Sequence, residues 1–433
     1  MCRQFNTVGP IGIFLVLILL LTSCVDEFQA SSPDHESILV VDARINDKVE
    51  KQQIFLSKTF PLSSDSLRPE SNAVIRLRDN TGLQLGFNEL SPGIYESESP
   101  IILHPQNEYQ LEIQTSDGVQ FTSSRESVPS KIPIEAINAK SIINGSDNEG
   151  VSVRVSTEVS SDSNPSFRYE YEETYQIVAP DYIGVEWDEV DYDFFMNDND
   201  GWEVAIQPAT EQFRVCYANN SSKDIVLGTT ENTTGNSLRD FEVRFISKQN
   251  YFLANRYSIL IKQYHHTTDA HSFYETLTNF SNFQSVFSNV QTGPLEGNIS
   301  SDNDAVQVIG YFELSSYSEK RAFFGFRDFY PEEPLPSYPI NCSRISKLDL
   351  YPEGFHFTII NGEIVLDGVS NSPLIDAILT GQVGFFDRNP DYVAGSTDED
   401  PDRAPYLLKP LGCVDCRALG STKQPDFWIE SNE

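Results

Sequence analysis

Polar and apolar residues alternate along the first third of the chain, and this period of two constrains the fold more than any other feature. Residues 72–78 and 108–114 each place apolar side chains at every second position. Such alternation predicts strands with one buried face. Turn-forming pairs such as Asp117-Gly118 separate the strands, and this predicts an N-terminal immunoglobulin-like β-sandwich over residues 38–130. The side chains expected on the apolar faces are Ala73, Ile75, Leu77, Tyr109, Leu111 and Ile113.

Residues 131–433 are expected to form a larger β-rich domain with one prominent α-helix. The proline-containing segment 128–133 interrupts the alternation and marks the boundary. Residues 256–264 have the composition of a buried strand. From Ala270 onward the apolar residues follow helical spacing, which predicts a helix near 269–289. The expected fold class is therefore mainly β.

An apolar stretch at residues 11–21 follows a single charge, Arg3. It is too short to span the hydrocarbon core as a helix, so residues 1–23 are expected to be a signal peptide. The next residues make it a lipoprotein signal, because Leu-Thr-Ser-Cys at 21–24 resembles the bacterial lipobox. The resemblance implies lipidation of Cys24 and attachment to a membrane through residues 24–37 as a tether. A secreted protein with an ordinary thiol at Cys24 is the alternative.

Four cysteines remain in the expected mature chain: Cys216, Cys342, Cys413 and Cys416. In an oxidising compartment they most simply form two disulfides, with three pairings open. The C-x-x-C spacing of the last two also occurs in zinc sites and redox pairs. Zinc would need two more nearby ligands, and a redox pair would need a preceding strand rather than the proline-rich loop found here. No metal site or cofactor is therefore predicted.

Acidic residues outnumber basic ones by 64 to 30, which gives a net charge of −34. Nucleic acid demands a cationic surface, so the charge argues against nucleic-acid binding. The acidity suits a soluble extracellular surface. A surface that gathers cations or basic peptides is the alternative.

Aromatic and acidic residues are interleaved between positions 181 and 202. Trp187, Tyr192 and Trp202 are candidates for a ligand platform, because aromatic faces stack on sugars or peptide groups while carboxylates accept hydrogen bonds. The alternative is a long hairpin whose aromatic side chains fill a neighbouring core.

The sequence gives little support for catalysis. It contains no P-loop, no dinucleotide-binding fingerprint and no zincin motif. Residues 235–239 begin like a nucleophile elbow but have Arg239 in place of the second glycine. His265, His266, Asp269 and His271 could ligate a metal, although a strand-to-helix junction with solvated imidazoles is the favoured interpretation. We therefore expect no catalytic residues and no enzyme activity.

The tail carries the most distinctive motif: Cys413-Val-Asp-Cys-Arg417, Gly420-Ser-Thr422 and Phe427-Trp428. It resembles the closing signature of the DUF4249 family of Bacteroidetes lipoproteins. Residues 39–46, 216–217, 256–258, 297–299 and 310–312 are similar to other family segments. Ser421 departs from the pattern, because glycine is expected there. The two tail aromatics are expected to dock on the large domain, with a partner interface as the alternative.

The resemblance implies a location and a partner. The family has no assigned reaction, and its members resemble accessory surface lipoproteins of TonB-dependent outer-membrane transporters. Asp26 and Glu27 behind Cys24 resemble a surface-export signal. We expect a lipid-anchored, cell-surface accessory subunit of such a transporter that helps nutrient capture or uptake. The alternative is an independent adhesin or a glycan- or peptide-binding module that uses the aromatic stretch.

Overall fold

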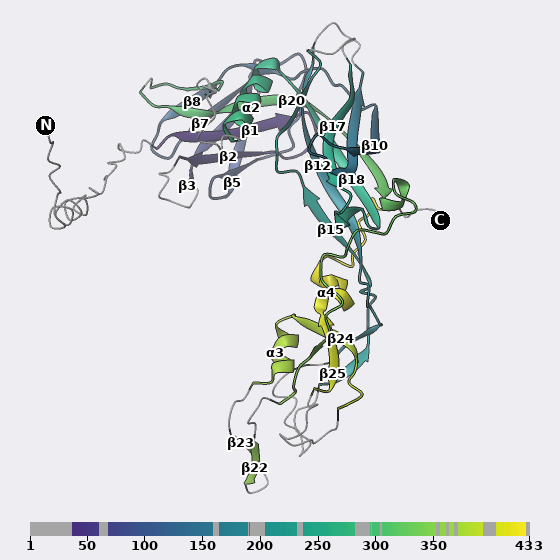
Figure 1. Cartoon of the computed structure of the whole chain (residues 1–433). Coiled ribbons are helices and arrows are strands. Elements are labelled where there is room, and N and C mark those ends of the chain that lie inside the picture. The colour runs from purple at the N-terminus through teal and green to yellow at the C-terminus, as the bar shows by residue number, and fades with distance from the viewer. Residues whose placement is uncertain are drawn as a thin grey trace, which may run out of the picture.

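Most of the chain is β-structure, as the sequence predicts. The structure is a computed structural model that describes residues 37–59, 68–158, 164–188, 190, 204–231, 237–281, 295, 297–303, 305–351, 356–360, 363–367, 371–392 and 404–429. Figure 1 shows an N-terminal body and a central body side by side, with a small subdomain projecting from the central body.

The N-terminal body wraps one sheet around one core, in the strand order β1-β2-β6-β5-β4-β7-β8-β19. The predicted inward side chains at positions 73, 75, 77, 109, 111 and 113 are all buried in this core. The alternating pattern therefore assigned the faces of these strands correctly. The strands are β1 (Leu39–Asn46), β2 (Gln53–Lys58), β3 (Arg68–Pro69), β4 (Val74–Asp79), β5 (Gln84–Ser91), β6 (Ile94–Ser97), β7 (Glu108–Gln114), β8 (Gln120–Ser123), β9 (Glu126–Ser127), β19 (Ile299–Ser301) and the first half of β20 (Val308–Gly325).

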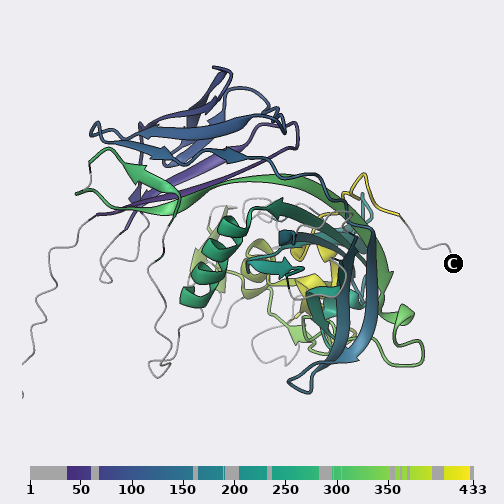
Figure 2. The ribbon, with the colours of Figure 1, turned by 90° about the horizontal axis from the view of Figure 1, so that it is seen from above.

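The strand β20 belongs to both bodies. Its residues 308–315 pair in parallel with β1, and residues 316–325 pair antiparallel with β18. Figure 2 shows β20 as a long arch from one body to the other. The two bodies thus share one hydrogen-bonded sheet of 15 strands. The N-terminal body consequently includes residues 299–301 and 308–315, which lie outside the segment 38–130 that the sequence suggested.

Two glycines allow the strands of the N-terminal body to close around its core. Gly310 has φ +147°, and a Cβ there would lie 2.1 Å from the carbonyl oxygen of Val41. A Cβ on Gly297 would lie 1.8 Å from the carbonyl oxygen of Gly310. Between them, the side-chain amide of Asn298 donates to the carbonyl of Phe312 and accepts from its N–H, at 2.9 and 2.7 Å. Close backbone approach explains the glycines in these family-like segments.

The central body consists of two packed sheets. Aromatic and β-branched side chains from both sheets form its core, including Val153, Tyr169 and Tyr257. One sheet contains β12 (Ser166–Val178), β15 (Val215–Ser221), β16 (Val226–Thr229), β18 (Arg256–His266) and the second half of β20, and the other contains β10 (Ala136–Ile143), β11 (Glu149–Thr157) and β17 (Leu238–Ser247). Two short 3₁₀ helices, η2 (Tyr251–Leu253) and η3 (Phe326–Asp328), flank β18 and β20.

The helix α2 (Thr268–Ser281) follows β18 directly, as the change of period predicts. The hydroxyl of Thr267 accepts a hydrogen bond from the N–H of Ala270 at 3.2 Å and caps the helix. Positions 282–289 of the predicted helix lie outside the described residues. The helix lies beneath the arch of β20 (Figure 2). Its Phe273 packs on Tyr311 of that strand. In the described ranges, no helix combines the length and apolar character needed to cross a bilayer.

The small subdomain has its own apolar core, which includes Leu374, Ile375 and Leu408. Ser372 caps its helix α3, and Pro373 occupies the first helical position, as both residue types prefer. The elements are β13 (Val185–Trp187), β14 (Ile206–Pro208), β21 (Ser346–Lys347), β22 (His356–Ile360), β23 (Glu363–Asp367), α3 (Pro373–Leu379), β24 (Val383–Arg388), β25 (Tyr406–Pro410), α4 (Leu411–Val414) and η4 (Cys416–Ala418).

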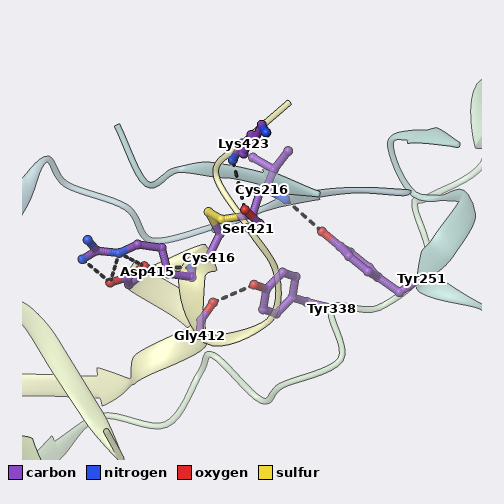
Figure 3. Close-up of a disulfide and its surroundings, with 10 residues drawn as sticks. Cys216, Tyr251, Tyr338, Gly412, Asp415, Cys416, Ser421 and Lys423 are labelled. Carbon is purple, nitrogen blue, oxygen red and sulfur yellow. Dashed lines mark hydrogen bonds and ion pairs between the residues drawn. A yellow bond between two sulfur atoms is a disulfide. The ribbon is translucent and has the colours of Figure 1, made fainter. Parts of the chain in front are cut away.

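Two disulfides brace the neck between the small subdomain and the central body. Cys216 on β15 is bonded to Cys416 in η4 (Figure 3), and Cys342 is bonded to Cys413 in α4. The predicted pair of disulfides is confirmed, and the C-x-x-C cysteines bond to distant partners rather than to each other. These two disulfides exclude the zinc-site and redox-pair alternatives for the four cysteines.

Other tail residues hold the same neck. Asp415 makes a bidentate ion pair with Arg417, and the hydroxyl of Tyr338 donates to the carbonyl of Gly412 at 2.6 Å (Figure 3). Ser421, the departure from the family pattern, forms an antiparallel bridge with Tyr217. The backbone at Ser421 has no positive φ, so a side chain is accommodated there.

The last described residues dock on the central body. Trp428 is 7% exposed and packs edge-on against Tyr217 and Phe323. The guanidinium of Arg321 lies 3.5 Å from the ring centre of Phe427, which stays partly exposed. The expected docking of the tail is thus observed.

Candidate functional site

The bend of the shared sheet places charged side chains in an unusual position. Alternate residues of β20, namely Tyr311, Glu313 and Ser315, lie on its concave face, because their neighbours Phe312 and Leu314 point into the N-terminal core. Tyr311 packs under α2. Glu313 follows at the crease between the two bodies, and it is the centre of the candidate site.

A fully buried ion pair occupies this crease. The guanidinium of Arg168 on β12 lies 3.2 Å from a carboxylate oxygen of Glu313, and the two side chains are 3% and 0% exposed. Burial opposes ionisation of Glu313, but Arg168 and the nearby His266 together outweigh it and hold the pKa of Glu313 well below its ordinary value. Burial likewise opposes the charge of Arg168, but Glu313, Tyr274 and Glu170 together raise its pKa. Both groups are therefore charged at neutral pH.

From this pair, a chain of alternating charges runs outward to the surface. Arg168 also contacts Glu170, whose carboxylate accepts from Arg44 at 3.3 Å and from the hydroxyl of Tyr264 at 3.1 Å. Arg44 in turn makes two 2.7 Å bonds to Asp42. Because each charge has an opposite neighbour, the side chains are held in fixed orientations.

A histidine pair continues the chain inward toward α2. His266 is buried, its Nε2 lies 3.2 Å from Nδ1 of His271, and its Nδ1 lies 3.7 Å from a carboxylate oxygen of Glu313. The last distance is too long for a hydrogen bond. We assign a proton to Nδ1 of His266, since a lone pair there would face the carboxylate. Burial and the charge of His266 lower the pKa of His271 to about 4.

Two hollows open on either side of this network. One, of about 650 Å³, lies beside Tyr311 and α2. The other, the crease groove, has a volume of about 300 Å³. Its charged lining consists of Asp42, Arg44, Glu50, Lys51, Arg168 and Glu170. The uncharged lining consists of Asn46, Gln52, Gln53, Phe55, Tyr264 and Ser315.

This arrangement suits the binding of a polar ligand. Paired carboxylates and guanidinium groups keep free hydrogen-bonding capacity while their positions stay fixed. Across the described ranges, no three histidine, cysteine or carboxylate side chains converge where they could hold a metal ion.

Trp187, the first residue of the candidate ligand platform, is half-buried and packs against the core of the small subdomain. Its ring makes edge contacts with Phe385 and Tyr406 at centroid distances of 5.7 and 5.4 Å, and its indole N–H is buried. This position matches the alternative interpretation, in which the aromatic side chain fills a neighbouring core. Tyr192, Trp202 and the lipidation candidate Cys24 lie outside the described residues.

The histidines at the strand-to-helix junction differ from the sequence expectation. His265 and His266 are 9% and 2% exposed, so their imidazoles are not solvated. The ring of His265 contacts the carbonyl of Ser130 at 2.8 Å. The sheet bend buries them, because β20 lies alongside the end of β18.

Sequence reasoning missed Arg168 and Glu313 altogether. They are 145 residues apart and meet only because β12, β18 and β20 are neighbours in one sheet. No local signal marked them, because Arg168 alternates with Phe167 and Tyr169, and Glu313 lies between Phe312 and Leu314. Alternation therefore places both charges on the face opposite the apolar core, where exposure is the ordinary expectation.

Comparison with known proteins identifies a family but no activity. No curated protein matches the chain. A solved structure of a DUF4785 family protein from Legionella pneumophila subsp. pneumophila str. Philadelphia 1 aligns with 52% of this chain and 52% of its own, at 10% identity and a TM-score of 0.17. This chain spans about half of that protein, and the TM-score is too low to indicate a shared fold. Residues 25–321, more than half of the chain, match the model of the family described as "Domain of unknown function (DUF4249)". The chain therefore belongs to the DUF4249 family, as its motifs predict.

Proposed function

We propose that the protein is a lipid-anchored lipoprotein of the outer membrane surface and a non-enzymatic accessory subunit of a TonB-dependent transporter, where it helps to capture a nutrient. The lipobox at residues 21–24 and the acidic residues behind it support the anchor and its location. An immunoglobulin-like character of the N-terminal body is part of the same proposal, supported by its antiparallel strands around one core.

The observation that carries the proposal is the two-ended shape of the molecule. The first strand, β1, begins at the end of the N-terminal body that points away from the small subdomain (Figure 1). The small subdomain projects from the opposite part of the molecule and is fixed there by two disulfides. A protein tethered at one end and carrying a rigidly held projection at the other is suited to contact a membrane partner.

The test is a mild-detergent pull-down of the tagged protein from its native outer membrane, with partners identified by mass spectrometry. We expect one TonB-dependent barrel in roughly equal amount. The Cys24→Ala variant, which lacks the lipid acceptor, should lose both membrane attachment and the barrel. Recovery of the lipidated protein alone would count against an accessory role, and resistance to protease on intact cells would count against surface exposure.

A further inference from the structure

The formal charges of the side chains that line the crease groove add up to zero. Three are carboxylates, from Asp42, Glu50 and Glu170, and three are cations, from Arg44, Lys51 and Arg168. This balance is notable in a chain with a net charge of −34.

Each of these charges is already paired within the protein. Asp42 and Glu170 pair with the two arginines, Lys51 lies 3.2 Å from Glu96, and Glu50 lies 3.2 Å from Lys48. A charged ligand would have to displace one of these partners and would face a like charge beside it. A neutral ligand incurs neither cost, so the groove favours uncharged polar molecules.

The groove nevertheless offers many hydrogen-bonding groups. Arg44 uses three of its five N–H groups in bonds to Asp42 and Glu170, so two remain. The side-chain amide of Gln53 makes no hydrogen bond to another described residue. The hydroxyl of Ser315 is buried without a partner in the described structure. A ligand with several hydroxyl groups would satisfy these donors and acceptors together.

An exposed aromatic ring lies beside these polar groups. Phe55 is 40% exposed, and it lies directly opposite Asp42 across the β1–β2 pair. Side chains opposite each other on one face of a sheet are close neighbours. The groove thus places the apolar ring of Phe55 beside the paired carboxylate of Asp42 and guanidinium of Arg44.

We propose that the crease groove binds a neutral saccharide. The C–H face of one sugar ring stacks on Phe55, and its hydroxyls bond to Asp42, Arg44 and Gln53. The volume of about 300 Å³ lies at the small end of ligand sites and suits a short oligosaccharide segment. The inference rests on the capture role proposed above and names the chemical class of its ligand.

Calorimetric titration of the full chain tests this inference. The probes are short neutral oligosaccharides built from glucose, xylose, mannose or galactose, with oligogalacturonate and an uncharged-side-chain peptide for comparison. We expect at least one neutral saccharide to bind. Phe55→Ala should weaken that binding about tenfold, as loss of a stacking ring does. Gln53→Ala, on the same strand, should weaken it about threefold.

Phe280→Ala is the matched control, because this ring of α2 is also 40% exposed but does not line the groove. It should leave the affinity unchanged. The inference is overturned if no neutral saccharide binds, if Phe55→Ala and Gln53→Ala bind as the unaltered protein does, or if the peptide or oligogalacturonate binds more tightly. Saccharide binding without a co-purified transporter would contradict only the accessory role. A co-purified transporter without saccharide binding would contradict only the saccharide inference.

Discussion

Replacing Glu313 with glutamine tests whether the buried ion pair stabilises the sheet bend. The substitution keeps the shape of the side chain and leaves Arg168, which is 3% exposed, with Glu170 as its one acidic contact among the described residues. Removal of one partner from a buried pair costs about 3–5 kcal/mol. Because Glu170 still contacts the guanidinium, we expect the lower end, about 3 kcal/mol of unfolding free energy.

The double variant Arg168→Met/Glu313→Leu separates the charge from the packing. Apolar replacement of both members of a buried pair is often neutral or stabilising. The double variant should therefore be more stable than Glu313→Gln, although it differs more from the natural sequence.

The assay is hydrogen exchange in increasing urea, followed by mass spectrometry of peptides from β18 and β20. These peptides report the bend itself rather than the small subdomain. Glu319→Gln is the matched control, since this carboxylate lies on the same strand but is exposed; it should cost less than about 1 kcal/mol. A Glu313→Gln protein within about 0.5 kcal/mol of the unaltered one would refute the reasoning.

The pH dependence of this cost has a definite sign. Burial opposes ionisation of Glu313, but Arg168 and His266 together prevail, so the folded-state pKa is below the ordinary 4.5. The stabilisation is complete above the pKa of the unfolded carboxyl and is lost as the pH falls toward the folded-state pKa. The cost of Glu313→Gln should stay constant from about pH 8 to about pH 5 and shrink below about pH 4.5.

Three further substitutions make separate predictions. Burial and the charge of His266 lower the pKa of His271 from 6.5 to about 4, so the folded protein should lose stability as the pH falls from about 6.5 to about 4. His271→Gln should reduce that loss, as measured by thermal unfolding at a series of pH values. Trp428→Ala should cost about 3 kcal/mol and speed proteolysis of the tail, whereas the more exposed Phe427→Ala should cost less than about 1 kcal/mol; equal effects would show that the tail is not docked through the indole. Gly310→Ala should prevent stable closure of the N-terminal sheet, because its Cβ would lie 2.1 Å from a backbone oxygen; an unchanged melting temperature would contradict this.

Local patterns predicted the elements that depend on local spacing. The alternation in residues 72–78 and 108–114 gave the buried faces of β4 and β7. The change to helical spacing after residue 266 placed the start of α2 within a residue or two of Thr268. In both cases the periodicity of one segment determines which side chains are buried, so no distant information is needed.

The shared sheet and the charged crease depend on contacts that periodicity does not contain. The pairing of β1 with β20 joins Leu39 to Val308, and nothing in either segment specifies the other. Glu313 and Arg168 occupy polar positions of their alternating strands, so the pattern marks them neither as buried nor as partners. The tail cysteines were identified from their number, but their pairing follows from the neck geometry.

The double membership of β20 determines the order in which the two bodies can fold. Strands β1 to β9 are complete at Ser127, but their outer neighbours begin only at Ile299 and Val308. During synthesis, which begins at the N-terminus, the edges of β1 and β8 therefore stay unpaired until most of the central body has been synthesised. Unpaired strand edges promote aggregation. We expect both bodies to finish folding late and together, at the slow rate of a sheet built from distant strands. The N-terminal body therefore cannot be transferred to another protein by itself, because the strand that pairs with β1 is the first half of β20, which continues into the central body.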